Sequence, residues 1–532
     1  MAQGAGKAVG TMRRREKMAG EAGLCADLGR GGRLTVPVRL CYTFSRMPMV
    51  CRTARKRKLR GGPPKPYLGI FLLAFFLLPA IFCLPSCRRG GGERAPEVPI
   101  VLLSIDTLRA DHLSCYGYRS ETSPAIDRFS REAVLFENAI SPSPVTTPAH
   151  VSIFTATTPA VHGCANIAAS ETDYEPLPAG IVSAAEVLKA AGYITLGMHG
   201  GANVEGLCGL GRGFDHYAPV PAESLNSHLA DSIHDFRTAA GPFFIFLHHY
   251  LCHDPYVNGP RELRLHFVKT RKDEMAAVVD EFGGQKRTVK MSDRFWRHFR
   301  LRDPEERELA QALYDGGVLC SDSLFAGTLE VLKKEGLYED ALIILLSDHG
   351  EEFHEHGGKL HSRLFIETLH VPLLIKFPHQ EFGGRRISQD VRTLDLFPTI
   401  FEYLGIGTRP PSFQGQSFLP LVTGRGQYDP LVMSFSPLGD RIRFQSQGYV
   451  FAHEPTTGYK TPFWVFDREK DPLEKVNLAD SRAELLRQME SKGQALLREQ
   501  LARARLFKSQ SGVRVPIDAE VTEKLRALGY VK

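Results

Sequence analysis

The feature that most constrains the fold of this chain is a set of short, continuous apolar runs. They occupy residues 98–105, 243–247, 341–346 and 371–377. Runs of this length without polar alternation are typical of strands buried on both faces, as in parallel sheets. Helical patterns such as residues 307–335 lie between them. The alternation predicts an α/β fold, a three-layer sandwich with a large, mostly parallel central sheet.

Changes in composition and hydrophobic pattern along the chain suggest where its domains begin and end. Residues 88–97 form a glycine-rich linker, and we expect the catalytic domain to span residues 98–428. Residues 259–303 are charged and irregular in pattern, and we interpret them as an insertion in this domain. Residues 429–532 are predicted to be a small C-terminal α+β unit. Its helical tail, residues 482–506, should pack on the body of the chain rather than on a partner.

The basic charge of the chain is confined to a leader, residues 1–66. This leader holds 16 Lys and Arg against three acidic residues, whereas the remaining chain holds 50 basic and 57 acidic residues. The main body is therefore mildly acidic, and nothing predicts a nucleic-acid partner. Met47 or Met49 would give a signal of more usual length, so a mis-assigned start is a second interpretation of the leader.

Residues 67–87 contain no charged side chain and follow the basic run at residues 55–58. This pattern is typical of a signal sequence or an N-terminal membrane anchor. The segment ends in Leu84-Pro85-Ser86-Cys87, which resembles a bacterial lipobox, so lipidation at Cys87 and an uncleaved helix are both open. Either way, the positive-inside rule predicts a membrane-anchored protein whose catalytic domain lies outside the cytoplasm, on the periplasmic side.

Polar side chains follow three of the predicted strands directly. Asp106 follows the first, His248 and His249 follow the second, and Asp348 and His349 follow the third. In open α/β sheets, sites gather beyond the carboxyl ends of the strands, so these groups should converge. Asp106, Asp348 and His349 would supply two carboxylates and an imidazole to a divalent cation. The imidazole favours Zn or Mn, with Mg or Ca as alternatives.

Thr146 lies in a hydroxyl-rich segment, Pro144-Val145-Thr146-Thr147-Pro148-Ala149-His150-Val151-Ser152. Pro148 is suited to the first turn of a helix, where backbone N–H groups and the helix dipole favour an anion. Taken alone, Thr146 would be interpreted as a plain helix cap.

Motifs in a fixed order over about residues 99–478 change that interpretation. They are IDTLRADHLSCYGY, SPAIDRFSREAVLFENAISPSPVTTPAHVSIFTATTPAVHG, FFIFLHHYLCHDPY, LLSDHGEEFHEHGG, LHVPLLI, RTLDLFPTIFEYLGI, FQGQSFLPLV and FDREKDPLEKVNL. In this order they resemble landmarks of the sulfatase family, in the alkaline phosphatase superfamily. The resemblance is to the branch with a threonine at the nucleophile position.

The resemblance implies roles for individual residues. Asp106, Asp348 and His349 would bind the metal, and Thr146 would complete its ligand set and act as the nucleophile. His253 would be the general acid at the leaving-group oxygen. The implied substrate contacts are His150, His361, which could also bind a second metal, and Asn203.

Four further positions are less specific. His199 competes with Asn203 as a substrate contact, and both fit a glycine-rich turn held by local hydrogen bonds equally well. His248 is expected to be buried with a backbone partner. His354 and His356 belong to a charged loop, and we expect them on the solvated surface.

Two departures from the family pattern bear on the chemistry. Thr146 stands where sulfatases carry the Cys or Ser that is oxidised to formylglycine, and His150 stands where they carry Arg. A threonine cannot become formylglycine, so no such cofactor is expected. Thr107 replaces a second Asp of many sulfatases, which weakens the case for calcium.

These features predict a metal-dependent hydrolase or transferase of phosphate or sulfate esters, with a covalent Thr146 intermediate and with phosphate favoured. The substrate would be a small-molecule, lipid-headgroup or glycan ester. Two alternatives stay open. One is a sulfuric ester hydrolase that is independent of formylglycine, and the other is an inert relative that binds anionic glycans or lipid headgroups.

Overall fold

The structure is a computed structural model that describes residues 98–165, 173–174, 176–238, 241–283, 289–455, 461–508 and 515–516. The predicted leader, the membrane or lipobox segment and the linker, residues 1–97, lie outside the described residues. Within the described part, no helix is both long enough and apolar enough to span a bilayer.

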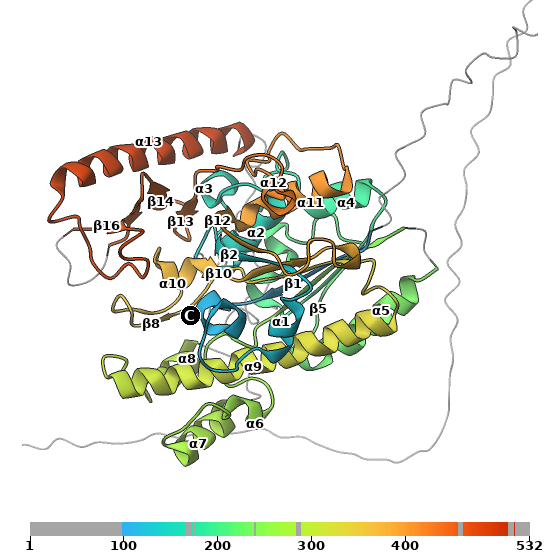
Figure 1. Ribbon diagram of the computed structural model, residues 1–532, viewed down its shortest axis with the longest axis horizontal. Helices are drawn as coiled ribbons and strands as arrows, with labels where there is room; N and C mark the ends of the chain where they lie inside the picture. The colour runs from blue at the N-terminus through green and yellow to red at the C-terminus, as the bar shows by residue number, and fades with distance from the viewer. Residues whose placement is uncertain are drawn as a thin grey trace, which may run out of the picture. The chain divides into compact units, whose positions relative to one another are not determined.

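A nine-stranded sheet forms the centre of the fold (Figure 1). Its middle strand is β1 (Ile100–Ile105), which pairs in parallel with β6 (Phe243–His249) and β7 (Leu342–Leu346). The sheet continues in parallel through β4 (Ile194–His199) to β5 (His216–Pro219). Three of the predicted apolar runs therefore supply the adjacent central strands.

The other edge of the sheet is mixed in direction. There β11 (Leu373–Lys376) runs antiparallel to β7, and β2 (Val134–Ile140) runs antiparallel to β11. The edge is completed by β10 (His370–Val371), antiparallel to β2, and β12 (Arg386–Arg392), parallel to it. The sheet is mostly parallel, and the predicted fold class is confirmed.

Alternate residues of the central strands enter two separate apolar cores, which makes three layers. Val101 and Leu103 of β1 pack in one core, whereas Ile100 and Leu102 pack in the other. This follows from the two-residue period of a strand. Helices α5 (Leu225–Phe236) and α9 (Pro304–Lys334) cover the first face, and α2 (Thr146–Thr155), α4 (Ala184–Ala190) and α11 (Leu396–Leu404) cover the second (Figure 1).

Local capping signals in the sequence explain where two of these helices begin. Ser183 and Glu186 form a capping box at the start of α4. Asp303 accepts a hydrogen bond from the Glu305 N–H at the start of α9, and Pro304 occupies the first helical position. Both arrangements pair backbone N–H groups that the first turn of a helix leaves without partners.

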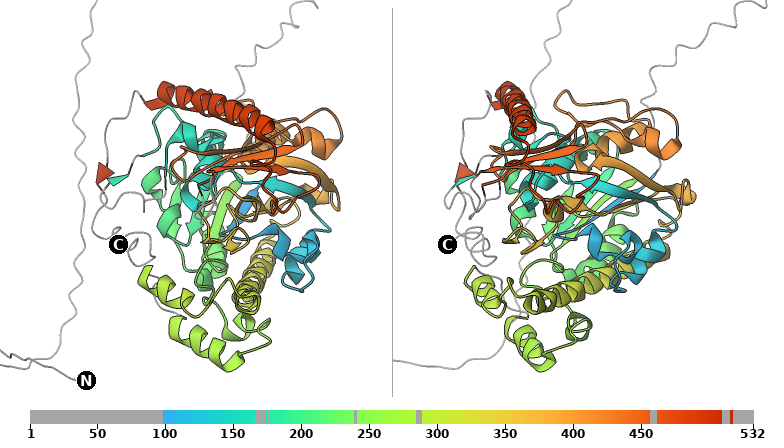
Figure 2. Two further views of the ribbon diagram at one scale, coloured as in Figure 1. Left: turned by 90° about the vertical axis from the view of Figure 1, so that its left-hand side faces the viewer. Right: turned by 60° about the vertical axis from the view of Figure 1, so that its left-hand side comes forward.

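The chain from Met433 onward forms a second, antiparallel sheet, which confirms the small C-terminal α+β unit of the predicted fold. Helix α13 packs on this sheet and on α3 (Pro159–His162) of the main body, as expected (Figure 2). The elements of the unit are β13 (Met433–Phe435), β14 (Ile442–Ser446), β15 (Tyr449–His453), β16 (Phe463–Asp467) and α13 (Ala483–Lys508).

The predicted insertion is more regular than its sequence pattern indicated. It folds into α6 (Arg261–Arg264), α7 (Lys272–Phe282) and α8 (Val289–Trp296), and apolar side chains of α7 and α8 join the core of the α9 face. The remaining short elements are α1 (Pro124–Phe129), β3 (Asp173–Tyr174), β8 (Glu352–Phe353), β9 (Lys359–Leu360), α10 (Ile366–Leu369), α12 (Leu419–Thr423) and β17 (Val515–Pro516).

Candidate metal centre and active site

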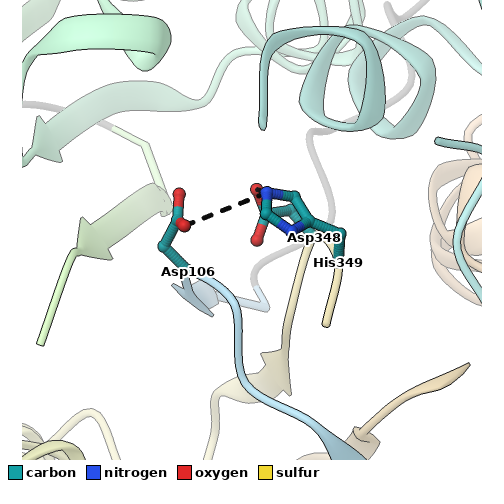
Figure 3. A group of neighbouring side chains, drawn as sticks. All are labelled: Asp106, Asp348 and His349. Carbon is teal, nitrogen blue, oxygen red and sulfur yellow. Dashed lines mark ion pairs between the residues drawn. The ribbon is translucent and has the colours of Figure 1, made fainter. Parts of the chain in front are cut away.

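Three predicted metal ligands meet beyond the carboxyl ends of two adjacent strands. Asp106 follows β1, and Asp348 and His349 follow β7 closely. One ligand atom from each of the three side chains lies within 4.8 Å of the others, and all three residues are buried. Figure 3 shows the Asp106 carboxylate facing the other two side chains. The parallel pairing of β1 with β7 therefore creates the cluster.

Thr146 places its hydroxyl beside this cluster. Its Oγ1 lies 3.3 Å from Asp106 Oδ2 and 3.2 Å from His349 Nε2. Thr146 is the first residue of α2, and the preceding Val145 has an extended backbone. Because the first N–H groups of a helix have no partner within it, the hydroxyl sits at an end that favours negative charge.

The carboxylate of Asp348 fits a cation. It is fully buried, and its oxygens make no hydrogen bond of normal geometry within the described part of the chain, with the ring nitrogens of His349 and His150 at 3.4 and 3.5 Å from Oδ2. Burial and the neighbouring Asp106 carboxylate raise the pKa of Asp348 to about 7. A divalent cation between the two carboxylates would offset both effects.

The tautomer of His349 also suits a ligand. Its Nδ1 lies 2.9 Å from the carbonyl oxygen of Gly350, so Nδ1–H donates and the Nε2 lone pair faces the cluster. Burial and the nearby His361 lower the pKa of His349 to about 4, which keeps the ring neutral at physiological pH. A neutral imidazole held by a backbone carbonyl is the usual form of a ligating histidine.

His150 lies behind Thr146, where protein groups engage both of its ring nitrogens. Its Nε2 is 3.0 Å from Ser104 Oγ and its Nδ1 is 3.0 Å from the Thr146 carbonyl oxygen, with Asp348 Oδ2 at 3.5 Å. Burial lowers the pKa of His150 to about 4. Neither ring nitrogen of His150 is therefore free for the contact with a substrate anion that the resemblance implies. Ser104, a lone hydroxyl within an apolar run, was not anticipated.

His248 is buried, as expected, but its partner differs from the expected backbone group. Its Nε2 lies 3.3 Å from Asp106 Oδ2. The rule that polar groups gather beyond the carboxyl ends of parallel strands could have indicated this contact, because β1 and β6 are adjacent in the sheet. His248 thus helps to orient the Asp106 carboxylate.

His253 and His361 border the cluster. His253 Nδ1 lies 3.0 Å from the Asp254 carbonyl oxygen, and its Nε2 lies 3.8 Å from Asp106 Oδ1. The His361 ring lies 4.9 Å from that of His253 and 4.4 Å from that of His349. Glu351, which sequence reasoning missed, holds His361 through a 3.2 Å contact between Oε1 and Nδ1.

His199 is the last residue of β4, and Asn203 lies in the turn that follows it. Thr147, next to the proposed nucleophile, donates its hydroxyl to the Asn203 carbonyl oxygen at 2.7 Å. The Asn203 side-chain amide is buried, and no hydrogen-bond partner faces it in the described part of the chain. His199 instead accepts the Gly201 N–H and packs on Tyr217. Of Asn203 and His199, Asn203 is therefore the residue whose polar side-chain atoms are available for a substrate contact.

The prediction that His356 is solvated is wrong. This residue is only 7% exposed; its Nδ1 pairs with Glu367 at 2.8 Å, and its ring stacks on Phe365. Although burial opposes it, the Glu367 carboxylate raises the pKa of His356 to about 9. His354 is half-buried with a left-handed backbone (φ +75°). The residues that bury His356 come from a later helix and strand, which the local charge pattern could not reveal.

Several known proteins resemble this chain in sequence or in fold. The N-acetylglucosamine-6-O-sulfatase of Bacteroides thetaiotaomicron is 21% identical over 434 residues, covering 66% of this chain and 75% of that protein. A Bacteroides fragilis protein assigned as a sulfatase has a similar fold, with a TM-score of 0.61 at 19% identity, covering 78% of this chain and 99% of that one. A phosphonate monoester hydrolase of Agrobacterium radiobacter has a TM-score of 0.56 at 18% identity, covering 76% and 96%.

A family model described as Sulfatase matches residues 99–406, more than half of the chain and all the residues of the cluster. The chain therefore belongs to the sulfatase family, in the alkaline phosphatase superfamily.

Proposed function

We propose that this protein is a metal-dependent ester hydrolase or transferase that uses Thr146 as a covalent nucleophile and prefers phosphate esters. The observation that carries the proposal is the position of the Thr146 hydroxyl, within 3.3 Å of two candidate metal ligands. A threonine that served only as a helix cap would not need to lie beside two buried carboxylates and a neutral imidazole.

Asp106, Asp348, His349 and Thr146 would hold the cation. The imidazole among them favours Zn or Mn over Ca, which prefers oxygen ligands. When bound, such a cation would lower the pKa of the Thr146 hydroxyl and offset the negative charge of the ester.

Thr146 Oγ1, whose proton would already have been lost to solvent, would attack phosphorus, so that a new O–P bond forms and the bond from phosphorus to the leaving oxygen breaks. Protonated His253 would donate its Nε2 proton to the leaving oxygen, which departs as an alcohol. The Asp254 carbonyl oxygen orients this ring through Nδ1, and Asp106 lies 3.8 Å away to stabilise its positive charge. His361 and the Asn203 amide would contact the non-bridging oxygens.

In the second step, neutral His253 would take a proton from water, or from an acceptor alcohol. The hydroxide or alkoxide oxygen formed in this way attacks phosphorus, and the bond from phosphorus to Thr146 Oγ1 breaks, which restores deprotonated Thr146 and protonated His253. His150 would act as a positioning residue, because its hydrogen bond to the Thr146 carbonyl oxygen fixes the first turn of α2.

The preference for phosphorus follows from the residue at position 146. A sulfated formylglycine hydrate can expel sulfate by breaking its own C–O bond, but a sulfated threonine has no such route. A phosphothreonine is cleaved by attack at phosphorus, which the same residues support. The structural similarity to a phosphonate monoester hydrolase supports this preference, whereas the several sulfatases among the relatives support sulfate esters as the second candidate.

The test is mass spectrometry of the full-length chain, quenched during turnover of aryl phosphate, phosphonate and sulfate esters with Zn or Mn. We expect a phosphoryl group on Thr146. Thr146→Val should abolish turnover while keeping the side-chain shape. Thr155→Val, which removes a buried hydroxyl from the far end of the same helix, is the matched control and should stay active.

Two other outcomes would replace the proposal. Faster turnover of sulfate than of phosphate esters, without formylglycine, would make the protein a sulfuric ester hydrolase. Binding of anionic glycans or lipid headgroups without turnover of any ester would make it an inert relative. Unchanged turnover in Thr146→Val would exclude Thr146 as nucleophile.

We also propose that residues 67–87 anchor the protein in a membrane with the catalytic domain on the periplasmic side. The charge-free apolar segment behind a basic run supports this location. Protease treatment of spheroplasts should degrade the catalytic domain if it lies outside. Mass spectrometry of the mature N-terminus would distinguish lipidated Cys87 from an uncleaved helix.

A further inference from the structure

A groove with two lobes lies between the predicted insertion and the loop that follows the metal ligands. The lobes have cavity volumes of about 480 Å³ and 320 Å³ and share five lining residues, so they form one groove. The shared residues are Arg302, His354, Gly357, Gly358 and Lys359.

The groove combines an apolar base with two exposed cations. Trp296, Phe299 and Leu301 line the smaller lobe, and the Lys359 ammonium lies 5.0 Å from the centre of the Trp296 ring. Within the described chain, neither Arg302 nor Lys359 has an ion-pair partner, and both are exposed.

The other charged groups of the groove are already neutralised. Arg363 pairs with Glu352, and Glu355 pairs with Arg109 at 2.6 Å. His356 pairs with Glu367, as described above. In the described part of the groove, Arg302 and Lys359 lie outside close ion pairs, although Lys359 also interacts at longer range with the Asp254 and Asp293 carboxylates. These two cations are therefore the ones that can meet an anionic ligand.

Two routes connect this groove to the proposed active site. Along the chain, Lys359 lies two residues before His361, with Leu360 between them in a left-handed conformation (φ +67°). Through space, the Trp296 ring lies 5.8 Å from that of Tyr256, whose hydroxyl lies near the Glu351 side chain that holds His361. A leaving group that departs past His253 and His361 would therefore be close to the groove.

We propose that this groove binds the leaving group of the substrate, and that this group is a ring-containing alcohol with a negative charge of its own. The inference rests on the proposed function and narrows its substrate class. The apolar base accommodates the ring, and Arg302 and Lys359 bind its carboxylate, sulfate or phosphate. The two cations belong to the insertion and to β9, so this specificity is a property of this chain's own loops.

The first test compares two esters that differ only in charge, the meta-carboxyphenyl and meta-carbamoylphenyl esters of the acid that the full-length enzyme cleaves best. The wild-type enzyme should prefer the carboxylate. Arg302→Gln and Lys359→Gln should each reduce this preference about 2- to 5-fold, through KM rather than kcat. Lys359→Arg should retain it. Lys334→Gln, an exposed charge at the end of α9, is the matched control.

The second test needs no turnover, so it separates failure of the groove from failure of the proposed chemistry. Binding of meta-hydroxybenzoate against meta-hydroxybenzamide, and of glucuronate against glucose, would be measured by NMR titration. The proposal is supported if the anion binds more tightly than the neutral compound in the aryl pair or in the sugar pair, and if both Gln variants lose this preference. The pair that shows the preference tells which kind of ring the groove binds. Equal binding of both members of each pair, or equal effects on both esters, would overturn the inference.

Discussion

Replacing Asp348 by asparagine tests whether this carboxylate is arranged for a cation. In the folded protein, burial and the Asp106 carboxylate raise the pKa of Asp348 to about 7, from an ordinary value of 3.8. Without metal, the folded protein therefore binds this proton more tightly than the unfolded chain does. Its stability should fall as the pH rises from about 4 to about 7 and should then stay level.

The pKa difference of about three units corresponds to no more than about 4 kcal/mol, at about 1.4 kcal/mol for each unit. Asparagine has the shape of protonated aspartic acid, so Asp348→Asn removes this loss. In EDTA the two proteins should be equally stable near pH 4. At about pH 8 the variant should be more stable by up to about 4 kcal/mol. In excess Zn or Mn the parent should instead be the more stable of the two proteins, because the variant lacks one charged metal ligand.

Urea unfolding followed by tryptophan fluorescence measures this difference, because both tryptophans of the chain, Trp296 and Trp464, are buried. Asp231→Asn, at an exposed position on α5, is the control and should show no pH-dependent difference. If Asp348→Asn were less stable than the parent at every pH in EDTA, the carboxylate would have a structural partner and the reasoning would be refuted.

Three further predictions concern the same loop and the general acid. Gly350→Ala should lower the bound metal per chain, measured by elemental analysis, because its Cβ would lie 2.1 Å from the Glu367 carbonyl oxygen; Gly407→Ala, with open space, should not. His356→Gln should destabilise the protein by about 1 to 3 kcal/mol below pH 6.5, and the loss should vanish as the pH rises through about 9, where the parent's pair with Glu367 loses its proton. A constant difference across that range would contradict this. His253→Gln should lower kcat about 10²- to 10⁴-fold for alkyl esters and much less for para-nitrophenyl esters, whose leaving oxygen needs no proton; equal losses would exclude an acid role.

Much of the fold could be predicted from the sequence because buried parallel strands leave a local signal. The apolar runs correspond to β1, β6, β7 and, in residues 371–377, to β10 and β11. Strand β2 contains Glu137 and Asn138, and β4 contains Gly197, so neither forms an uninterrupted apolar run. The antiparallel direction of β11 is also absent from the local pattern, because direction depends on how distant strands pair.

The cluster of Asp106, Asp348 and His349 could be predicted because each follows a strand of one parallel sheet. The engaged state of His150 could not, because its partners Ser104 and Asp348 are distant in the chain. The same holds for Glu351, which approaches His361 only when the loop after β7 folds back on itself.

The sequence by itself determined the order of elements, the chemical groups at the strand ends and the threonine that rules out formylglycine at position 146. These are properties of single residues or of short segments. Only the tertiary structure decided which groups meet, namely that the Thr146 hydroxyl lies between Asp106 and His349, and that Arg302 and Lys359 share a groove. Such contacts depend on the path of the whole chain, and no local pattern of residues encodes that path.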